Sequence, residues 1–181
     1  DIKVFSGAPQ TGVMGQEITG LRLSAGGTYG TAFREGLNVA VGDFNGDGMA
    51  DIVTTPSRGA PIVKVFQNNV LLGGGLTPAR SFNAFADQPK FIGGATVAVG
   101  DVTGDGVAEV VVGSGTGMAG QVRVFNVATA AASYSPLFTI ADPKPKLRGG
   151  VFVATGDVNG DGAAEIVTAT GPLGGSWIRV Y

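Results

Sequence analysis

The chain has 181 residues, 44% of them hydrophobic and only 14% charged, which fits a single folded domain rather than a disordered protein. Cysteine and histidine are both absent. Thiolate or imidazole metal sites, Cys nucleophiles and Ser-His-Asp triads are therefore excluded, and oxygen ligands are the only metal chemistry on offer. The net charge of −2 includes no basic run that would favour nucleic-acid binding, and no apolar run approaches the roughly 20 residues that span a bilayer.

A short strand is predicted at the very start of the chain. Residues 2–5 read Ile-Lys-Val-Phe, and β-branched and aromatic residues favour a pleated strand. The same order of apolar, basic, Val and aromatic residues returns at 63–66, 122–125 and 178–181. Residues 6–38 are the least repeat-like part, and no chemistry is assigned to them.

From residue 39 onward the predicted elements follow one constant order. An apolar strand leads into an acidic loop, at 39–42, 97–100 and 152–156. A second strand leaves the loop, at 51–55, 109–113 and 165–169. A Gly-rich turn then leads to the basic-aromatic strand, and a more variable fourth strand follows near 80–86 and 137–141. The Ala-rich residues 127–132 are expected to form a connection with at most one helical turn.

Four short strands in each period of roughly 57 residues predict one four-stranded antiparallel sheet per repeat. The first strand of each repeat is apolar throughout, so it needs cover on both faces. We therefore expect an all-β fold, a β-propeller built of four-stranded antiparallel blades with about three repeats present. Residues 1–181 would form a single propeller segment, divided into 1–38 (a partial blade), 39–96, 97–152 and 153–181 (a partial blade).

The three acidic loops start at Asp43, Asp101 and Asp157 and run for nine residues each. Oxygen-bearing side chains at positions 1, 3, 5 and 9, with Gly at 4 and 6, form a cage of hard oxygens, which is the ligand type that Ca²⁺ prefers. The main-chain carbonyl of position 7 would complete each set. The predicted ligands are Asp43, Asn45, Asp47, Met49 and Asp51; Asp101, Thr103, Asp105, Val107 and Glu109; and Asp157, Asn159, Asp161, Ala163 and Glu165.

Two other interpretations explain these loops less well. An EF-hand needs a bidentate Glu at position 12, where Thr54, Val112 and Thr168 stand. Asp-Gly and Asn-Gly pairs alone make tight hairpin turns, which explains two or three residues per loop but not five oxygens recurring three times. The second loop is predicted to bind calcium most weakly, because Thr103 offers only a hydroxyl at position 3.

Loop and exit strand together, at 43–53, 101–111 and 157–167, resemble the FG-GAP/VCBS repeat family, the calcium-loop blades of integrin α-subunit propellers and many bacterial surface proteins. The resemblance covers residues 39–181 and implies a calcium-binding β-propeller. The Gly-Ala-Pro that the family carries after the exit strand is replaced, at 55–56, 113–115 and 169–171. This departure is closer to the bacterial variants than to integrins.

The basic residue of each repeated strand has two interpretations, an anion or glycan site in every blade or a side chain that packs between blades and reaches a neighbouring acid. The second is favoured for Lys3, Lys64, Arg123 and Arg179. Their aromatic partners Phe5, Phe66, Phe125 and Tyr181 are expected in the core between blades. Trp177 could stack on a sugar, although packing at an edge is favoured.

The expected function is non-enzymatic, a calcium-stabilised propeller of an extracellular or cell-surface protein that serves as a binding or adhesion scaffold. The alternative is a carbohydrate-binding propeller, a lectin or the accessory module of a carbohydrate-active enzyme. Acids outside the loops are scattered in sequence, which argues against catalysis: Asp1, Glu17, Glu35, Asp87 and Asp142. Partners would be calcium (about three ions per chain) and a protein or glycan on a propeller face, without nucleic acid or membrane insertion. The ring would be closed by a homodimer or by the remainder of a longer chain.

Overall fold

The computed structural model describes residues 2–5, 17–23, 28–69, 75–129, 134–141, 148–172, 175 and 177–181. It is built of β-strands joined by turns, so the all-β prediction is confirmed. No helix in these ranges is both long enough and apolar enough to cross a membrane. The strands are β1 (Ile2–Phe5), β2 (Glu17–Leu23), β3 (Leu37–Gly42), β4 (Asp51–Pro56), β5 (Ile62–Asn68), β6 (Leu76–Asn83), β7 (Ala95–Gly100), β8 (Glu109–Ser114), β9 (Gln121–Phe125), β10 (Phe138–Ala141), β11 (Val151–Gly156), β12 (Glu165–Thr170) and β13 (Ile178–Val180).

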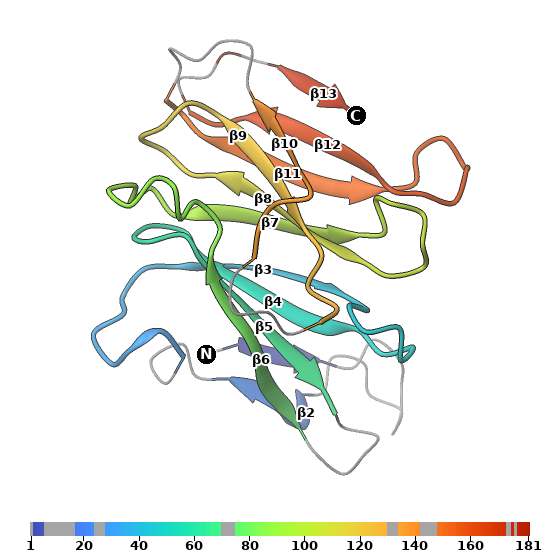
Figure 1. Ribbon diagram of the computed structural model, residues 1–181. Coiled ribbons are helices and arrows are strands. Elements are labelled where there is room, and N and C mark those ends of the chain that lie inside the picture. Colours follow the sequence, from blue (N-terminus) through green and yellow to red (C-terminus); the bar gives the residue numbers. More distant parts are fainter. Residues whose placement is uncertain are drawn as a thin grey trace.

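Antiparallel sheets follow one another along the chain, as Figure 1 shows. Two have four strands, in the orders β3-β4-β5-β6 and β7-β8-β9-β10, and a third has β11-β12-β13. These three sheets are open and up-and-down, as blades of a partial propeller are. The strands β1 and β2 pair separately; β2 was not anticipated, because it lies in the stretch with least resemblance to the repeat.

The first strands of successive blades lie next to one another and form the inner edge of the assembly. Strand β7 packs against both β3 and β11. Small residues permit this approach: a Cβ on Gly42 would collide with Val99 of the next blade, and a Cβ on Gly100 would collide with Thr155. Hydrogen bonds cross the same gaps, since Thr155 Oγ1 donates to Val99 O at 2.6 Å and Asn38 Nδ2 donates to Ala95 O at 2.7 Å.

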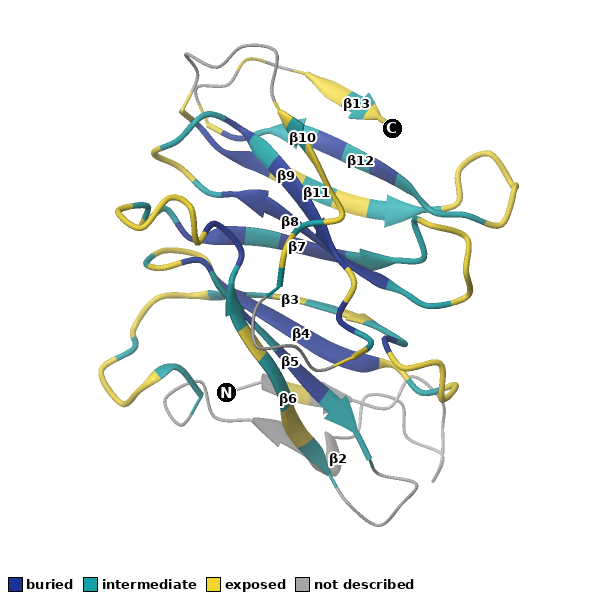
Figure 2. Cartoon of the chain, viewed as in Figure 1, coloured by how far each residue is buried: buried dark blue, intermediate teal, exposed yellow. Residues whose placement is uncertain are grey.

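Apolar side chains from facing blades form the core. Between the first and second blades, Val53, Val65, Val110 and Phe125 are all at most 2% exposed and belong to one cluster. A second, smaller cluster joins the second and third blades. The buried residues therefore concentrate in the middle of the stack (Figure 2), which is the burial expected of repeats that only contact their neighbours.

The first strands were expected to be covered on both faces, and only the middle one is. Strand β7 has no fully exposed residue. In the flanking blades Val41 is 57% exposed and Phe152 is 55% exposed, so the part of the chain that the structure describes does not cover these side chains.

The basic-aromatic strands give a mixed outcome. Phe66 and Phe125 are buried as predicted, and no side chain is described for Phe5. The prediction for Tyr181 is wrong, since its side chain is 47% exposed on the uncovered third blade. For Arg123 the structural interpretation is confirmed, because its guanidinium binds Asp87 of the preceding connection at 2.6 Å.

Most predicted strand bounds agree with the structure within about two residues. The exception is the fourth strand of the first blade, predicted near 80–86, since β6 ends at Asn83 and a turn follows. Asn83 Oδ1 accepts the amide of Phe85 at 2.8 Å, and this side-chain turn ends the strand. Of the predicted connection at 127–132, residues 130–132 lie outside the described part, and 127–129 form no strand.

Candidate metal sites

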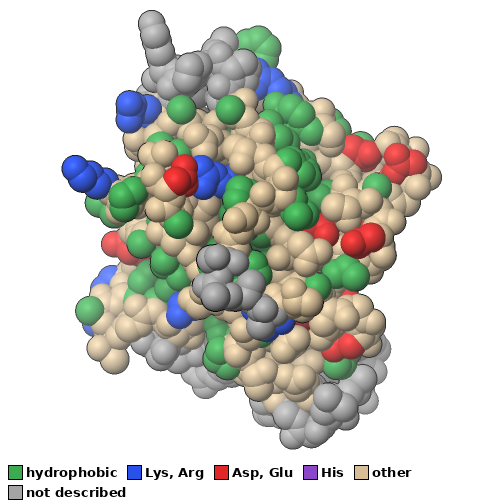
Figure 3. All heavy atoms as spheres, viewed as in Figure 1, with side chains coloured by type: hydrophobic (Ala, Val, Ile, Leu, Met, Phe, Trp, Pro, Cys, Tyr) green, Lys and Arg blue, Asp and Glu red, His purple; other side chains and the backbone are tan. Residues whose placement is uncertain are grey.

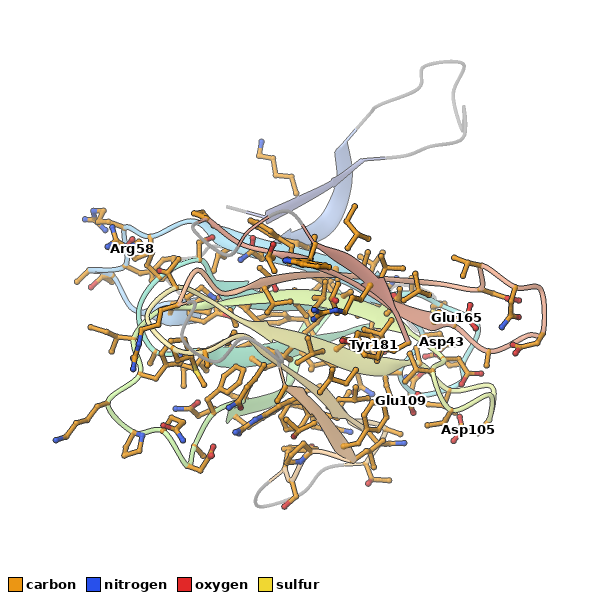
Figure 4. All side chains as sticks on the ribbon, turned by 90° about the horizontal axis from the view of Figure 1, so that it is seen from above. Asp43, Arg58, Asp105, Glu109, Glu165 and Tyr181 are labelled. Carbon is orange, nitrogen blue, oxygen red and sulfur yellow. The ribbon has the colours of Figure 1, made fainter. Side chains whose placement is uncertain are left out.

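All three acidic loops connect the first and second strands of their blades, so they lie at one end of the molecule. Gly42 pairs with Asp51 where β3 turns into β4, and Gly100 and Gly156 pair with Glu109 and Glu165 in the next blades. Figure 4 shows Asp43, Asp105, Glu109 and Glu165 gathered on the side away from Arg58. The propeller-like stacking therefore brings three loops together that are far apart in the sequence.

Position 1 of each loop is an aspartate that binds the backbone of its own turn. In the first loop Asp43 Oδ1 accepts the amide of Gly46 at 2.7 Å and its Oδ2 accepts the amide of Gly48 at 2.8 Å. The same pair of bonds recurs at Asp101 and Asp157. Both glycines have positive φ in all three loops, which explains why Gly stands at positions 4 and 6.

These amides keep the position-1 carboxylates ionised. Partial burial would raise the pKa of Asp43, but the amides of Gly48 and Gly46, with two others, bring it below its ordinary value. The same balance lowers the pKa of Asp101. At Asp157 the loop amides dominate outright and lower the pKa. The negative form that a cation requires is therefore present at neutral pH.

Positions 3 and 5 interact with each other in the first and third loops. Asn45 Nδ2 donates to Asp47 Oδ2 at 2.9 Å, and Asn159 Nδ2 donates to Asp161 Oδ2 at 3.0 Å. The second loop lacks this bond, since Thr103 Oγ1 donates instead to Glu109 Oε1 at 3.4 Å. In every loop the position-5 carboxylate accepts the amide of position 7, at 2.8 to 2.9 Å.

Position 9 lies on the exit strand, and the length of its side chain determines which backbone amide it contacts. In the second and third loops Glu reaches back, so that Glu109 Oε2 accepts the amide of Val102 at 3.1 Å and Glu165 Oε2 accepts that of Val158 at 2.8 Å. The shorter Asp51 in the first loop is fully buried and accepts the amide of Asn68 at 2.8 Å through Oδ1. Its Oδ2 is buried with no hydrogen-bond partner.

In the first and second loops, burial and like charges make the ionised position-9 carboxylate costly without a cation. Loss of hydration raises the pKa of Asp51, and the charges of Asp47 and Asp43 add to that rise against opposing backbone amides. Burial is also the main reason that the pKa of Glu109 is raised, and the charges of Asp105 and Asp101 add to that rise. A buried carboxylate oxygen without a donor costs free energy unless something positive meets it.

The donor set fits a hard cation. Carboxylate, amide and carbonyl oxygens on a tight turn are the ligands of Ca²⁺, and the unpartnered Asp51 Oδ2 is an oxygen still free to coordinate. The carboxylates are instead turned toward backbone amides, and the described residues contain no cluster of three acidic side chains arranged for a metal. In each loop, side-chain oxygens of positions 1, 3, 5 and 9 and the carbonyl of position 7 would hold the ion.

The second and third loops are each bonded to the loop before them, and no pattern in the sequence indicates these bonds. The amide of Ala108 donates to Asp43 O at 3.1 Å, and the amide of Ala164 donates to Asp101 O at 2.7 Å. In both cases position 8 of one loop binds the carbonyl of position 1 in its neighbour. Backbone hydrogen bonds therefore connect the three candidate sites in series.

Residues 43–112 match the family model of the FG-GAP-like repeat. The matched stretch runs from the first acidic loop through the first blade into β8. No curated protein is similar enough in sequence to match. The open antiparallel sheets fit partial propeller blades, and together with the match over residues 43–112 they suggest a β-propeller-like repeat module.

Proposed function

We propose that this module binds one Ca²⁺ in each of its three acidic loops and that the ions hold the loop end of each blade rigid. The observation that carries this proposal is that Asp51 Oδ2, a buried carboxylate oxygen, lacks a hydrogen-bond donor. It belongs to a loop whose other acidic side chains are also negatively charged. Bound calcium would supply positive charge and direct oxygen coordination. The chain's own residues supply the cradle, because the amides of positions 4 and 6 fix the first aspartate.

The function that follows is that of a non-enzymatic binding or adhesion scaffold. Calcium would have a structural role, since its ligands come from both the loop and the strand that leaves it, so the ion would hold the two together. An extracellular or cell-surface setting suits the proposal, because weak oxygen sites are filled at millimolar calcium and mostly empty in cytosol.

The scaffold also needs a neighbour on its third blade. In the middle blade, the face that carries Ala98, Val111 and Val124 is buried against the next sheet. The strand register places an equivalent apolar set on the third blade, and none of its members is fully buried by the described residues: Phe152, Ala154, Val167, Ala169, Ile178 and Val180. Ile178 is 74% exposed and Val180 is 54% exposed. We propose that another blade of the same kind packs here, from a second copy or from the remainder of a longer chain.

Calorimetric titration tests the metal proposal. The wild-type protein should bind calcium at three sites, and Asp51→Asn should weaken the first site most strongly, because the amide keeps the shape but loses the charge. Glu35→Gln is the control, because Glu35 is exposed and lies outside the loops, so the variant removes one negative charge without touching a site. Fewer than two sites in the wild type would overturn the proposal.

Light scattering tests the assembly. A second copy on the third blade predicts a mass above that of one chain at micromolar concentration, and Ile178→Ser with Val180→Ser should restore the single-chain mass. A stable, soluble single-chain species in the wild type would contradict pairing of copies.

A further inference from the structure

The end of the molecule opposite the acidic loops carries a groove with basic walls. It has a volume of about 430 Å³ and lies where turns of the first and second blades meet the connections between blades. Arg58, Lys90 and Arg148 line it, together with Phe91, Ile92 and Met118. Figure 3 shows acidic side chains mostly toward the right of the view, whereas basic ones lie along the left edge, over the middle and near the top, and Figure 4 places Arg58 far from the labelled loop acids.

Backbone hydrogen bonds between blades fix the walls of this groove. The amide of Gly59 donates to Ile92 O at 2.9 Å, which ties the turn after Arg58 to the connection that carries Ile92. The amide of Gly117 donates to Arg148 O at 2.9 Å, and Arg148 Nη1 returns a bond to Gly117 O at 3.0 Å. The groove is therefore built on ordered backbone, which lowers the entropy cost of binding.

Among the described residues, no acidic side chain neutralises the positive charge of the groove. Arg58 and Lys90 form no ion pair with any described residue, and no acidic side chain lines the groove. The closest acid in the sequence, Asp87, is engaged by Arg123 through two bonds of 2.6 and 2.9 Å. Three cations therefore face an aqueous groove that attracts negative charge.

The apolar part of the groove is aliphatic. Ile92 is 71% exposed, and Met118 is half-buried beside it. Methionine adapts its shape at binding surfaces. The Phe91 ring meets Phe85 edge-on with centroids 5.6 Å apart and is half-buried, so it offers little of the open aromatic face on which a sugar ring would stack. An aliphatic side chain is the better match for this surface.

We propose that this groove binds an acidic peptide segment in which an aliphatic side chain stands beside carboxylates. The carboxylates would pair with Arg58, Lys90 and Arg148, and the aliphatic group would cover Ile92 and Met118. The site is separate from the calcium loops and does not depend on their occupancy.

Fluorescence anisotropy with a labelled Glu-Asp-Leu-Glu-Asp-Leu peptide tests this site, with a Gln-Asn-Leu-Gln-Asn-Leu peptide as the uncharged control. Wild-type protein should bind the acidic peptide and not the control, and binding should weaken as sodium chloride rises from about 50 to about 200 mM. Arg58→Gln with Lys90→Gln should weaken binding about tenfold or more. Ile92→Ser should weaken it about threefold.

Arg34→Gln is the matched control, because Arg34 is exposed, bonds only to Thr31 O and Phe33 O, and does not line the groove. It should leave affinity unchanged, and unfolding temperatures should be equal for all variants. Absent binding, equal binding of the uncharged peptide, or an equal loss in Arg34→Gln would overturn the proposal. Binding of a sulfated oligosaccharide that depends on Arg58 and Lys90, with no binding of the peptide, would overturn it in favour of an acidic glycan.

Discussion

The amide of Ala164 donates a hydrogen bond of 2.7 Å to the carbonyl oxygen of Asp101. The bond joins position 8 of the third loop to position 1 of the second, and Ala108 with Asp43 repeats it one blade earlier. In addition, a Cβ placed on Gly104 would lie 3.6 Å from the Ala163 side chain. An ion that orders one loop therefore orders part of the binding backbone of the next.

This linkage predicts that the three calcium sites are coupled. Asp105→Ala should abolish the second site and also weaken calcium binding at the first and third by several-fold, a coupling of about 1 kcal/mol. Asp161→Ala, in the third loop, should weaken calcium binding at the third site itself and at the second site, but not at the first. Calorimetric titration of both variants measures this, and independent sites in both would contradict the coupling.

The second loop should gain affinity when its missing amide is restored. Thr103→Asn would supply the carbonyl oxygen and the bond to Asp105 that Asn45 and Asn159 make in the other loops. Calcium affinity of the weakest site should rise about fivefold to tenfold. An unchanged weakest step would mean that position 3 does not contribute a ligand.

The ion pair of Arg123 with Asp87 predicts a defined acid dependence. The Arg123 guanidinium lowers the pKa of Asp87 from 3.8 to about 2. Because the folded-state pKa is depressed, the stabilisation is present above pH about 4 and disappears as pH falls through about 2. The free energies of unfolding of wild type and Asp87→Asn should therefore differ near neutral pH and converge near pH 2. A constant difference in denaturant unfolding across this range would show that the pair has no electrostatic role.

Equivalent aromatic residues should differ sharply in their contribution to stability. Phe125 is 1% exposed and packs against Phe82 with ring centroids 4.9 Å apart, so Phe125→Ala should cost about 3–5 kcal/mol. Tyr181 holds the same repeat position but is 47% exposed, and Tyr181→Ala should cost less than about 1 kcal/mol. Denaturant unfolding of both variants measures this. Similar costs would mean that the third blade is covered in solution.

The repeat determined how much could be predicted from the sequence. Strand order, the loops at Asp43, Asp101 and Asp157, and the burial of Phe66 and Phe125 all follow from patterns that recur at one period. Tyr181 was predicted wrongly because the pattern describes a blade with neighbours on both faces, and the third blade has one. A repeating pattern does not indicate which copy lacks a neighbour on one face.

Contacts between segments that are far apart in the chain could not be predicted from local sequence patterns. The pairing of Arg123 with Asp87 joins residues 36 apart, and no spacing rule connects a strand of one blade to the connection before it. The loop-to-loop bonds of Ala108 and Ala164 use only backbone atoms, which sequence does not distinguish. The basic groove likewise depends on turns of two blades meeting in space.

The most direct test of the central claim, that calcium stabilises this module through its loops, is the unfolding temperature in calcium against that in chelator. Metal that binds only the folded state raises stability by mass action. About 2 mM CaCl₂ should therefore raise the midpoint by roughly 5 °C or more above that in EGTA, and equal magnesium should raise it far less. An unfolding temperature that is the same in calcium and in EGTA would contradict the account.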